Sequence, residues 1–305
     1  MKMSVVMAAL LLVAGCAHSG LSVMPVPAPD QAHDVDGRYA YMSCNLEKVV
    51  EYHGDDLDAA EQVYLYALMS SNAYTDKGQY AIPGWTRVAR FESTSGLALD
   101  EWVRDGSSPR QKVVAFRGTE DLKDWQANLA LVEPWQHREA YEHIADLRRS
   151  EPHTLLTATG HSLGGALALN MSQRFENMPA YVFNSSPRAF FASEGARNQR
   201  TVVWETGELL NVFRRPWLGL RMQDAPRMQF NFMDYSWIRS AKVIQEHSMY
   251  GLSRGLLVSA AAKKNPHALD VIRVNIRPDN LEHHARDTCA SLVASTEGSA
   301  QNQTH

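Results

Sequence analysis

The sequence predicts an α/β fold with a mostly parallel central sheet and helices on both faces. Short apolar, strand-like runs alternate with helical segments through most of the 305 residues, an alternation typical of α/β domains. A serine flanked by glycines stands between one such strand and one such helix. Hydrophobic residues make up 45% of the chain, enough for a sizeable core, and the net charge of -4 gives no indication of nucleic-acid binding.

The expected elements follow from the spacing of apolar residues. An apolar stripe at helical spacing predicts a helix over residues 55–73. Three runs separated by turn signals predict an antiparallel meander over residues 86–91, 97–103 and 112–116. Further strands are expected at residues 154–159, 180–184 and 201–204, and a late edge strand at 271–276. Further helices are expected at residues 121–131, 138–149, 163–175 and 246–262.

The segment Gly160-His161-Ser162-Leu163-Gly164 carries the clearest chemical signal. It matches Gly-x-Ser-x-Gly, and a strand before it with a helix after it is the context of the nucleophile elbow in α/β hydrolases. The turn is too tight for side chains beside the serine, which explains the glycines. The helix that follows points its first N–H groups toward the site and favours developing negative charge. We therefore predict that Ser162 is a nucleophile and that His161 packs beneath the turn.

Three further segments carry a resemblance to a known family. Residues 113–119 read Val-Val-Ala-Phe-Arg-Gly-Thr, residues 124–129 read Asp-Trp-Gln-Ala-Asn-Leu, and residues 181–188 read Tyr-Val-Phe-Asn-Ser-Ser-Pro-Arg. With the serine motif, they resemble the class 3 (fungal-type) lipase family across the middle of the chain. The resemblance implies an α/β-hydrolase fold and hydrolysis of acylglycerol or phospholipid esters through an acyl-enzyme. It also implies an oxyanion hole formed by the backbone N–H groups of Thr119 and Leu163.

The catalytic base is expected after the serine, because α/β hydrolases carry their triad in the order serine, acid, histidine. The later histidines are His247, His267, His283, His284 and His305. His247 stands alone at the opening of a predicted helix, in a run similar to the one that holds the histidine of the lipase family. The others fall in a connection, in a charged stretch or in the polar tail. We therefore predict that His247 is the base.

The acid is predicted from its place after the strand at residues 201–204. The lipase family has an aspartate there, followed by two aliphatic residues, and Glu208, which precedes two leucines, best fits that position. A glutamate departs from the family pattern, but it can still orient the imidazole and stabilise the imidazolium. The alternatives are Glu205, Asp224 and Asp234.

Other functions are compatible with the same residues. The triad would also serve a thioesterase or amidase, and the substituted acid would suit a non-catalytic envelope lipoprotein that binds a lipid. Neither a metal nor a cofactor is expected, because no pair of His or Cys has ligand spacing beside a carboxylate. Arg117 is expected to pair with a carboxylate beneath its loop rather than to contact substrate.

The N-terminus predicts export and lipid attachment. Lys2 precedes a short apolar run at residues 5–13, too short to span a bilayer and typical of a signal peptide. Residues 12–16, Leu-Val-Ala-Gly-Cys, resemble the lipobox of bacterial lipoproteins, which implies cleavage before Cys16 and a membrane anchor on its thiol and amine. Ala17 is not acidic, which in that class favours the outer membrane.

The expected domain organisation follows from these segments. We predict a signal peptide at residues 1–15, a lipidated tether at 16–37, the hydrolase domain at 38–290 and a polar tail at 291–305. The expected partners are an ester substrate such as a lipid, and the membrane through Cys16. In the exported protein, Cys44 and Cys289 would either form a disulfide or stay as buried thiols.

Overall fold

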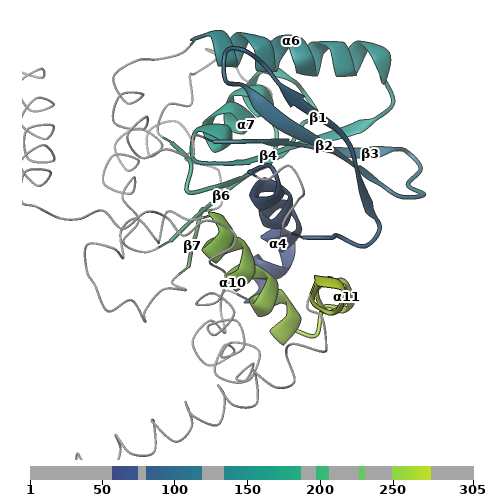
Figure 1. Ribbon diagram of the computed structural model, residues 1–305, viewed down its shortest axis with the longest axis vertical. Helices are drawn as coiled ribbons and strands as arrows, with labels where there is room; N and C mark the ends of the chain where they lie inside the picture. Colours follow the sequence, from purple (N-terminus) through teal and green to yellow (C-terminus); the bar gives the residue numbers. More distant parts are fainter. Residues whose placement is uncertain are drawn as a thin grey trace, which may run out of the picture.

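The centre of the computed structural model is a seven-stranded sheet whose strands follow one another in chain order (Figure 1). The structure describes residues 57–74, 80–118, 134–186, 197–205, 227–230 and 249–275. The strands are β1 (Trp85–Glu92), β2 (Ala98–Arg104), β3 (Gln111–Phe116), β4 (Leu155–His161), β5 (Ala180–Phe183), β6 (Arg200–Glu205) and β7 (Arg227–Phe230). The first three form the predicted antiparallel meander, and β3 to β7 run parallel.

Helices cover both faces of this sheet, as predicted. Helices α6 (Pro134–Ser150) and α7 (Leu163–Arg174) lie on one face, and α4 (Leu57–Asn72), α10 (Met249–Ala262) and α11 (Pro266–Asn275) lie on the other. The parallel crossovers β3–α6–β4 and β4–α7–β5 advance in one direction across the sheet. Right-handed crossovers that advance in one direction put their helices on the same face. The architecture confirms the predicted α/β-hydrolase fold.

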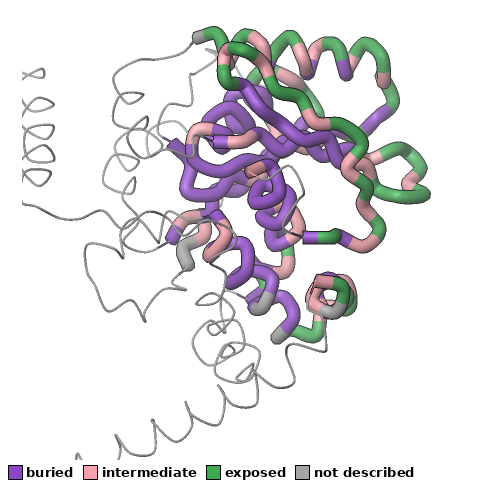
Figure 2. The backbone as a smooth tube through the Cα atoms, in the orientation of Figure 1, coloured by how far each residue is buried: buried purple, intermediate pink, exposed green. Residues whose placement is uncertain are grey.

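The alternation of side chains along the strands divides the core into two clusters. Val114 and Phe116 of β3 point toward α6 and α7, whereas Val113 and Ala115 point toward α4 and α10. Successive residues of a strand face opposite sides of a sheet, so a strand covered on both faces is apolar throughout. Buried residues accordingly run along the central strands and the inner helices, and exposed residues gather on the outer side of α6 and on β1 (Figure 2).

The predicted edge strand at residues 271–276 is wrong, because residues 271–275 form the end of α11. Its β-branched residues suggested a strand, but Ala268 and Val271 are buried one helical turn apart against the other helices. Asn265 caps the helix by accepting a hydrogen bond from the Ala268 N–H at 3.0 Å, and Pro266 occupies the first turn. The parallel strand next to β6 is instead the four-residue β7, which was not predicted.

Several predicted segments lie outside the described residues. These are the signal peptide, the tether, the helix at residues 121–131, the polar tail, and Cys16, Cys44 and Cys289. In the part of the chain that the structure does describe, no helix has the length and apolar character needed to cross a bilayer.

A buried ionic cluster joins β2, β3 and the end of α6. Lys112 Nζ lies 2.7 Å from Glu101 Oε2 and 2.6 Å from Glu151 Oε1, and His143 Nε2 lies 3.0 Å from Glu101 Oε1. Burial alone would raise the pKa of Glu101. The hydrogen bonds from His143 and Lys112 outweigh it and lower that pKa from 4.5 to about 2. The cluster therefore stabilises the fold most when Glu101 is ionised.

Replacing Glu101 with glutamine is expected to lower the free energy of unfolding by roughly 3 kcal/mol near pH 7. The pKa of Glu101 is lower in the folded state, so its contribution is complete above pH 4.5 and disappears as the pH falls toward 2. Urea unfolding of both proteins across that range measures the difference. Glu142→Gln, which breaks an exposed pair with Arg138 on α6, is the control and should change little. If the difference in the free energy of unfolding between wild type and Glu101→Gln stayed constant down to pH 2, this account would be contradicted.

Candidate active site

Ser162 occupies the sharp turn between β4 and α7. It has φ 54° and ψ -123°, a positive-φ conformation that is strained for a residue with a side chain. Strand β4 ends at His161 and α7 begins at Leu163, so one residue connects the two elements. The strand–turn–helix context predicted around the serine is therefore present.

The backbone of Ser162 is fixed by the strand and loop beside it. Its N–H donates to the Phe183 carbonyl at 3.1 Å, and its carbonyl accepts from the N–H groups of Ser186 at 2.9 Å and Ala166 at 3.3 Å. The side chain is buried, with 1% of the residue exposed, and it does not cap the helix in the way an N-cap serine ordinarily does. The turn is thus held by main-chain bonds, and the Ser162 hydroxyl makes no capping bond to α7.

Glycines are needed around the turn, as predicted, because neighbouring atoms leave no room for a Cβ at these positions. A Cβ on Gly164 would lie 2.2 Å from the Phe116 carbonyl oxygen, and a Cβ on Gly160 would lie 2.4 Å from that of Gly164. A Cβ on Gly165 would lie 3.0 Å from Ser185 Cβ. The start of α7 therefore packs directly on the backbones of β3 and β4, and only glycine permits that approach.

His161 packs beneath the turn, as predicted. It is buried, its Nδ1 lies 2.7 Å from the hydroxyl of Tyr74, and the two rings meet edge to face with centroids 5.7 Å apart. Tyr74 follows the end of α4, and sequence reasoning did not identify it. Its contacts with His161 and Gly118 span 87 and 44 residues, and no local pattern reveals contacts between residues so far apart in the chain.

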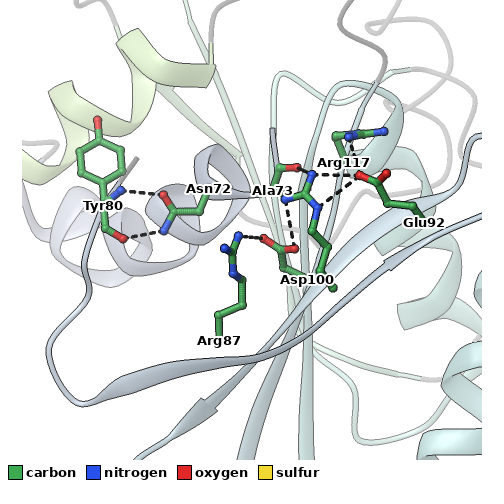
Figure 3. A network of polar contacts seen from close by, with 8 residues as sticks. Asn72, Ala73, Tyr80, Arg87, Glu92, Asp100 and Arg117 are labelled. Carbon is green, nitrogen blue, oxygen red and sulfur yellow. Dashed lines mark hydrogen bonds and ion pairs between the residues drawn. The ribbon is translucent and has the colours of Figure 1, made fainter. Parts of the chain in front are cut away.

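Arg117 pairs with a carboxylate, as predicted. Its Nη1 lies 3.0 Å from Glu92 Oε1, and the same oxygen lies 3.1 Å from Arg90 Nη2 (Figure 3). Arg87 and Arg90 also pair with the buried Asp100, at 3.2 and 3.5 Å. Burial raises the pKa of Asp100, and the arginines oppose that rise. The three arginines and two carboxylates form one network beside the carboxyl end of β3.

A polar pair, Asn184 and Glu205, lies at the carboxyl ends of β5 and β6. These strands run parallel to β4, so the pair is at the same edge of the sheet as Ser162. Asn184 follows β5 with φ 41°, and its Oδ1 accepts from the backbone N–H of Glu205 at 3.0 Å. Its Nδ2 donates to Glu205 Oε2 at 3.5 Å, and both residues are buried. In open parallel sheets, functional groups gather at this edge. Glu205, one of the alternative acids, thus lies two strands away from the strand that ends beside Ser162.

The other predicted site residues divide into two groups. Leu163 is the first residue of α7, where a backbone N–H has no partner within the helix. Thr119, Glu208, His247, Asp224 and Asp234 lie outside the described residues, and their roles stay predictions.

His267, one of the later histidines, lies in the first turn of α11. Its Nδ1 lies 2.7 Å from the Tyr64 hydroxyl, and its Nε2 lies 2.7 Å from the Pro83 carbonyl oxygen. These contacts hold α11 against α4. Among the described residues, no group of three or more histidines, cysteines or carboxylates is arranged to hold a metal ion.

Comparison with known proteins relates this region to lipid hydrolases. Residues 65–202 match the phospholipase-like family described as the Tle-like phospholipase domain. No curated protein sequence matches the chain. Similar solved structures include the lipase of Rhizopus microsporus var. chinensis, at 20% identity over 48% of this chain and 67% of that chain, with TM-score 0.36. The triacylglycerol lipase of Penicillium expansum is similar at 21% identity over 49% and 71%, with TM-score 0.36.

The sheet topology and the strained serine turn place this protein in the α/β-hydrolase fold class. The match over residues 65–202 supports the class 3 lipase-like relationship that the sequence motifs indicate.

Proposed function

We propose that the protein is a serine ester hydrolase of the lipase or phospholipase kind, with Ser162 as its nucleophile. The observation that carries the proposal is the conformation of Ser162, a strained serine between a buried strand and a buried helix whose glycines contact neighbouring backbone. Such strain is retained where the surrounding structure enforces it, which is typical of a nucleophile elbow. The match to a phospholipase-like family supports lipid esters as the substrate class.

The proposed reaction proceeds through an acyl-enzyme. Ser162 Oγ attacks the acyl carbon while His247 takes its proton, and His247 then returns that proton to the leaving alcohol. Water attacks the acyl-enzyme, His247 takes a proton from it, and the carboxylic acid leaves as Ser162 regains its hydrogen. Glu208 orients His247, with Glu205, Asp224 and Asp234 as the alternative acids. Because Ser162 is almost fully buried, the acyl group must enter between the surrounding elements before attack.

The assignment of the oxyanion donors rests on what flanks Ser162. Leu163 opens a helix, and its N–H lies at the positive end of the helix dipole. Thr119 comes directly after Gly118, and a Cβ on Gly118 would lie 3.1 Å from Ser162 Cβ. A tetrahedral intermediate needs two N–H donors directed at one oxyanion, and we assign these to Leu163 and Thr119.

The proposed location is the bacterial cell envelope, with the domain tethered to the outer membrane through lipid on Cys16. Support comes from the lipobox-like residues 12–16 and from the proline-containing segment that follows them. A tether of this kind would hold an ester hydrolase next to its lipid substrate.

Labelling with a fluorophosphonate probe tests the proposed function. The full-length protein in detergent is expected to form one covalent adduct, which peptide mass spectrometry should locate on Ser162. The same preparation should hydrolyse a short-chain nitrophenyl ester and a phospholipid in mixed micelles, and matched thioester and amide substrates should react more slowly. A protein that neither labels nor hydrolyses any of these substrates would be a binding protein, and the proposed function would be wrong.

A further inference from the structure

The hydroxyl of Tyr74 bridges the two segments that flank the candidate nucleophile. It accepts a hydrogen bond from the Gly118 N–H at 3.2 Å and lies 2.7 Å from Nδ1 of His161. His161 is the residue before Ser162, and Gly118 is the residue before Thr119. One side chain therefore connects the elbow to the loop that is expected to carry the second oxyanion donor.

A phenol hydroxyl suits this position because it donates one hydrogen bond and accepts others at the same time. In one arrangement the Tyr74 hydroxyl donates to His161 Nδ1. In the other, Nδ1–H donates to the hydroxyl, which then donates toward the His161 carbonyl at 3.5 Å. In both arrangements the hydroxyl oxygen still accepts from the Gly118 N–H. Phenylalanine would preserve the ring and remove that acceptor.

Gly118 is packed closely enough for small movements to matter. A Cβ at Gly118 would lie 2.5 Å from the Tyr74 hydroxyl oxygen, 2.6 Å from the His161 carbonyl oxygen and 3.1 Å from Ser162 Cβ. The same face of Gly118 thus packs against Tyr74, His161 and Ser162. Loss of the Tyr74 hydroxyl would let the Gly118 backbone move relative to the serine.

Tyr74 is itself held by a closed ring of contacts. Arg90 donates to the Ala73 carbonyl at 3.3 Å and pairs with Glu92, which also pairs with Arg117 (Figure 3). Ala73 precedes Tyr74, and Arg117 precedes Gly118, so the ring returns to the two residues that the hydroxyl joins. A cation at the last carbonyls of a helix is also favourable, and Arg90 occupies that place at the end of α4.

A second tie holds the same end of α4. The Asn72 side chain donates to the Tyr80 carbonyl and accepts from the Tyr80 N–H, both at 2.8 Å (Figure 3). Two independent sets of polar contacts therefore fix the turn from which Tyr74 reaches the elbow.

We propose that Tyr74 is a positioning residue that sets the Gly118 backbone relative to Ser162, and so affects the oxyanion donor that the proposed function assigns to the next residue, Thr119. This inference rests on the proposed function. Positioning of an oxyanion donor acts on the transition state more than on substrate binding. The expected signature of Tyr74 is therefore a change in kcat with KM preserved.

The test compares Tyr74→Phe with Tyr64→Phe in the full-length protein. Tyr64 lies on α4, which ends just before Tyr74, and its hydroxyl contacts Asn265 and His267, away from the elbow. Tyr74→Phe is expected to lower kcat for a nitrophenyl ester about 10- to 100-fold with KM within about twofold. The rate of fluorophosphonate labelling should fall in the same proportion, because the phosphonate oxygen uses the same donors. Tyr64→Phe should leave kcat and the labelling rate within about twofold of wild type.

A second variant covers the case in which Tyr74→Phe folds poorly. Glu92 is half exposed, so Glu92→Gln weakens the ring of contacts with little effect on the core. It is expected to lower kcat several-fold with KM unchanged. An active wild type whose kcat is unaffected by both Tyr74→Phe and Glu92→Gln would overturn the inference and leave the proposed function intact. A wild type that neither hydrolyses esters nor labels would overturn both.

Discussion

Replacing Ser162 with alanine is expected to reduce ester hydrolysis by about 10⁴-fold or more while the protein stays folded. In the proposed mechanism the hydroxyl forms the acyl-enzyme bond, so its loss removes the reaction pathway rather than one contribution to it. The fold should survive because the turn is held by the backbone bonds of Ser162 to Phe183 and Ser186, which alanine keeps. The measurements are kcat/KM for a nitrophenyl ester and the free energy of unfolding in urea.

Ser172→Ala is the matched control for this experiment. Ser172 lies on α7, the helix that follows Ser162, and is buried, and its hydroxyl oxygen accepts from Arg200 Nε at 3.2 Å. The control should lose some stability and keep full activity, the reverse of Ser162→Ala. Retention of more than about a tenth of the activity by Ser162→Ala would contradict the mechanism. His247→Ala, Glu208→Gln, Glu205→Gln, Asp224→Asn and Asp234→Asn in the same assay test which residues complete the triad.

The sheet and its covering helices could be predicted because their residues follow a regular period. The strands β2 to β6 alternate between two buried faces, and α7 is buried nearly all round because it packs against β3, β4 and β5. The turn at Ser162 could be predicted because close backbone contact leaves a visible trace, the glycines at 160, 164 and 165. In both cases the physical requirement is local in the sequence.

Elements that depend on distant contacts could not be predicted. Helix α11 has several β-branched residues, and its packing against α4 and α10 overrides their strand propensity. The four residues of β7 are too few to show a period, and only pairing with β6 defines them. The order of residues indicates which histidine and carboxylate could follow the serine, but it gives no distance from Ser162. Tyr74 and Asn184 are further cases, because each acts through a residue many positions away.

Gly164→Ala is expected to destabilise the protein by about 4 kcal/mol or more, the largest stability effect predicted for this chain. The new Cβ would lie 2.2 Å from the carbonyl oxygen and 2.7 Å from the carbonyl carbon of Phe116, and 2.8 Å from the carbonyl carbon of Arg117. All three are backbone atoms, so no side chain can rotate away to make room. Helix α7 would have to separate from β3, which would disturb both the core beneath it and the turn at Ser162.

Gly251→Ala is the control for a general effect of replacing glycine with alanine in a helix. Gly251 lies in α10, and a Cβ there would meet no atom within 4 Å. Alanine leaves the unfolded chain fewer backbone conformations than glycine does, and it fits the helical conformation at this position. Gly251→Ala should therefore stabilise the protein by about 0.5–1 kcal/mol. If the close approach of α7 to β3 is what requires glycine at position 164, urea unfolding should show a lower free energy of unfolding for Gly164→Ala and a higher one for Gly251→Ala. Equal, small effects of the two substitutions would mean that α7 can shift, and that the elbow is less tightly fixed than its main-chain contacts indicate.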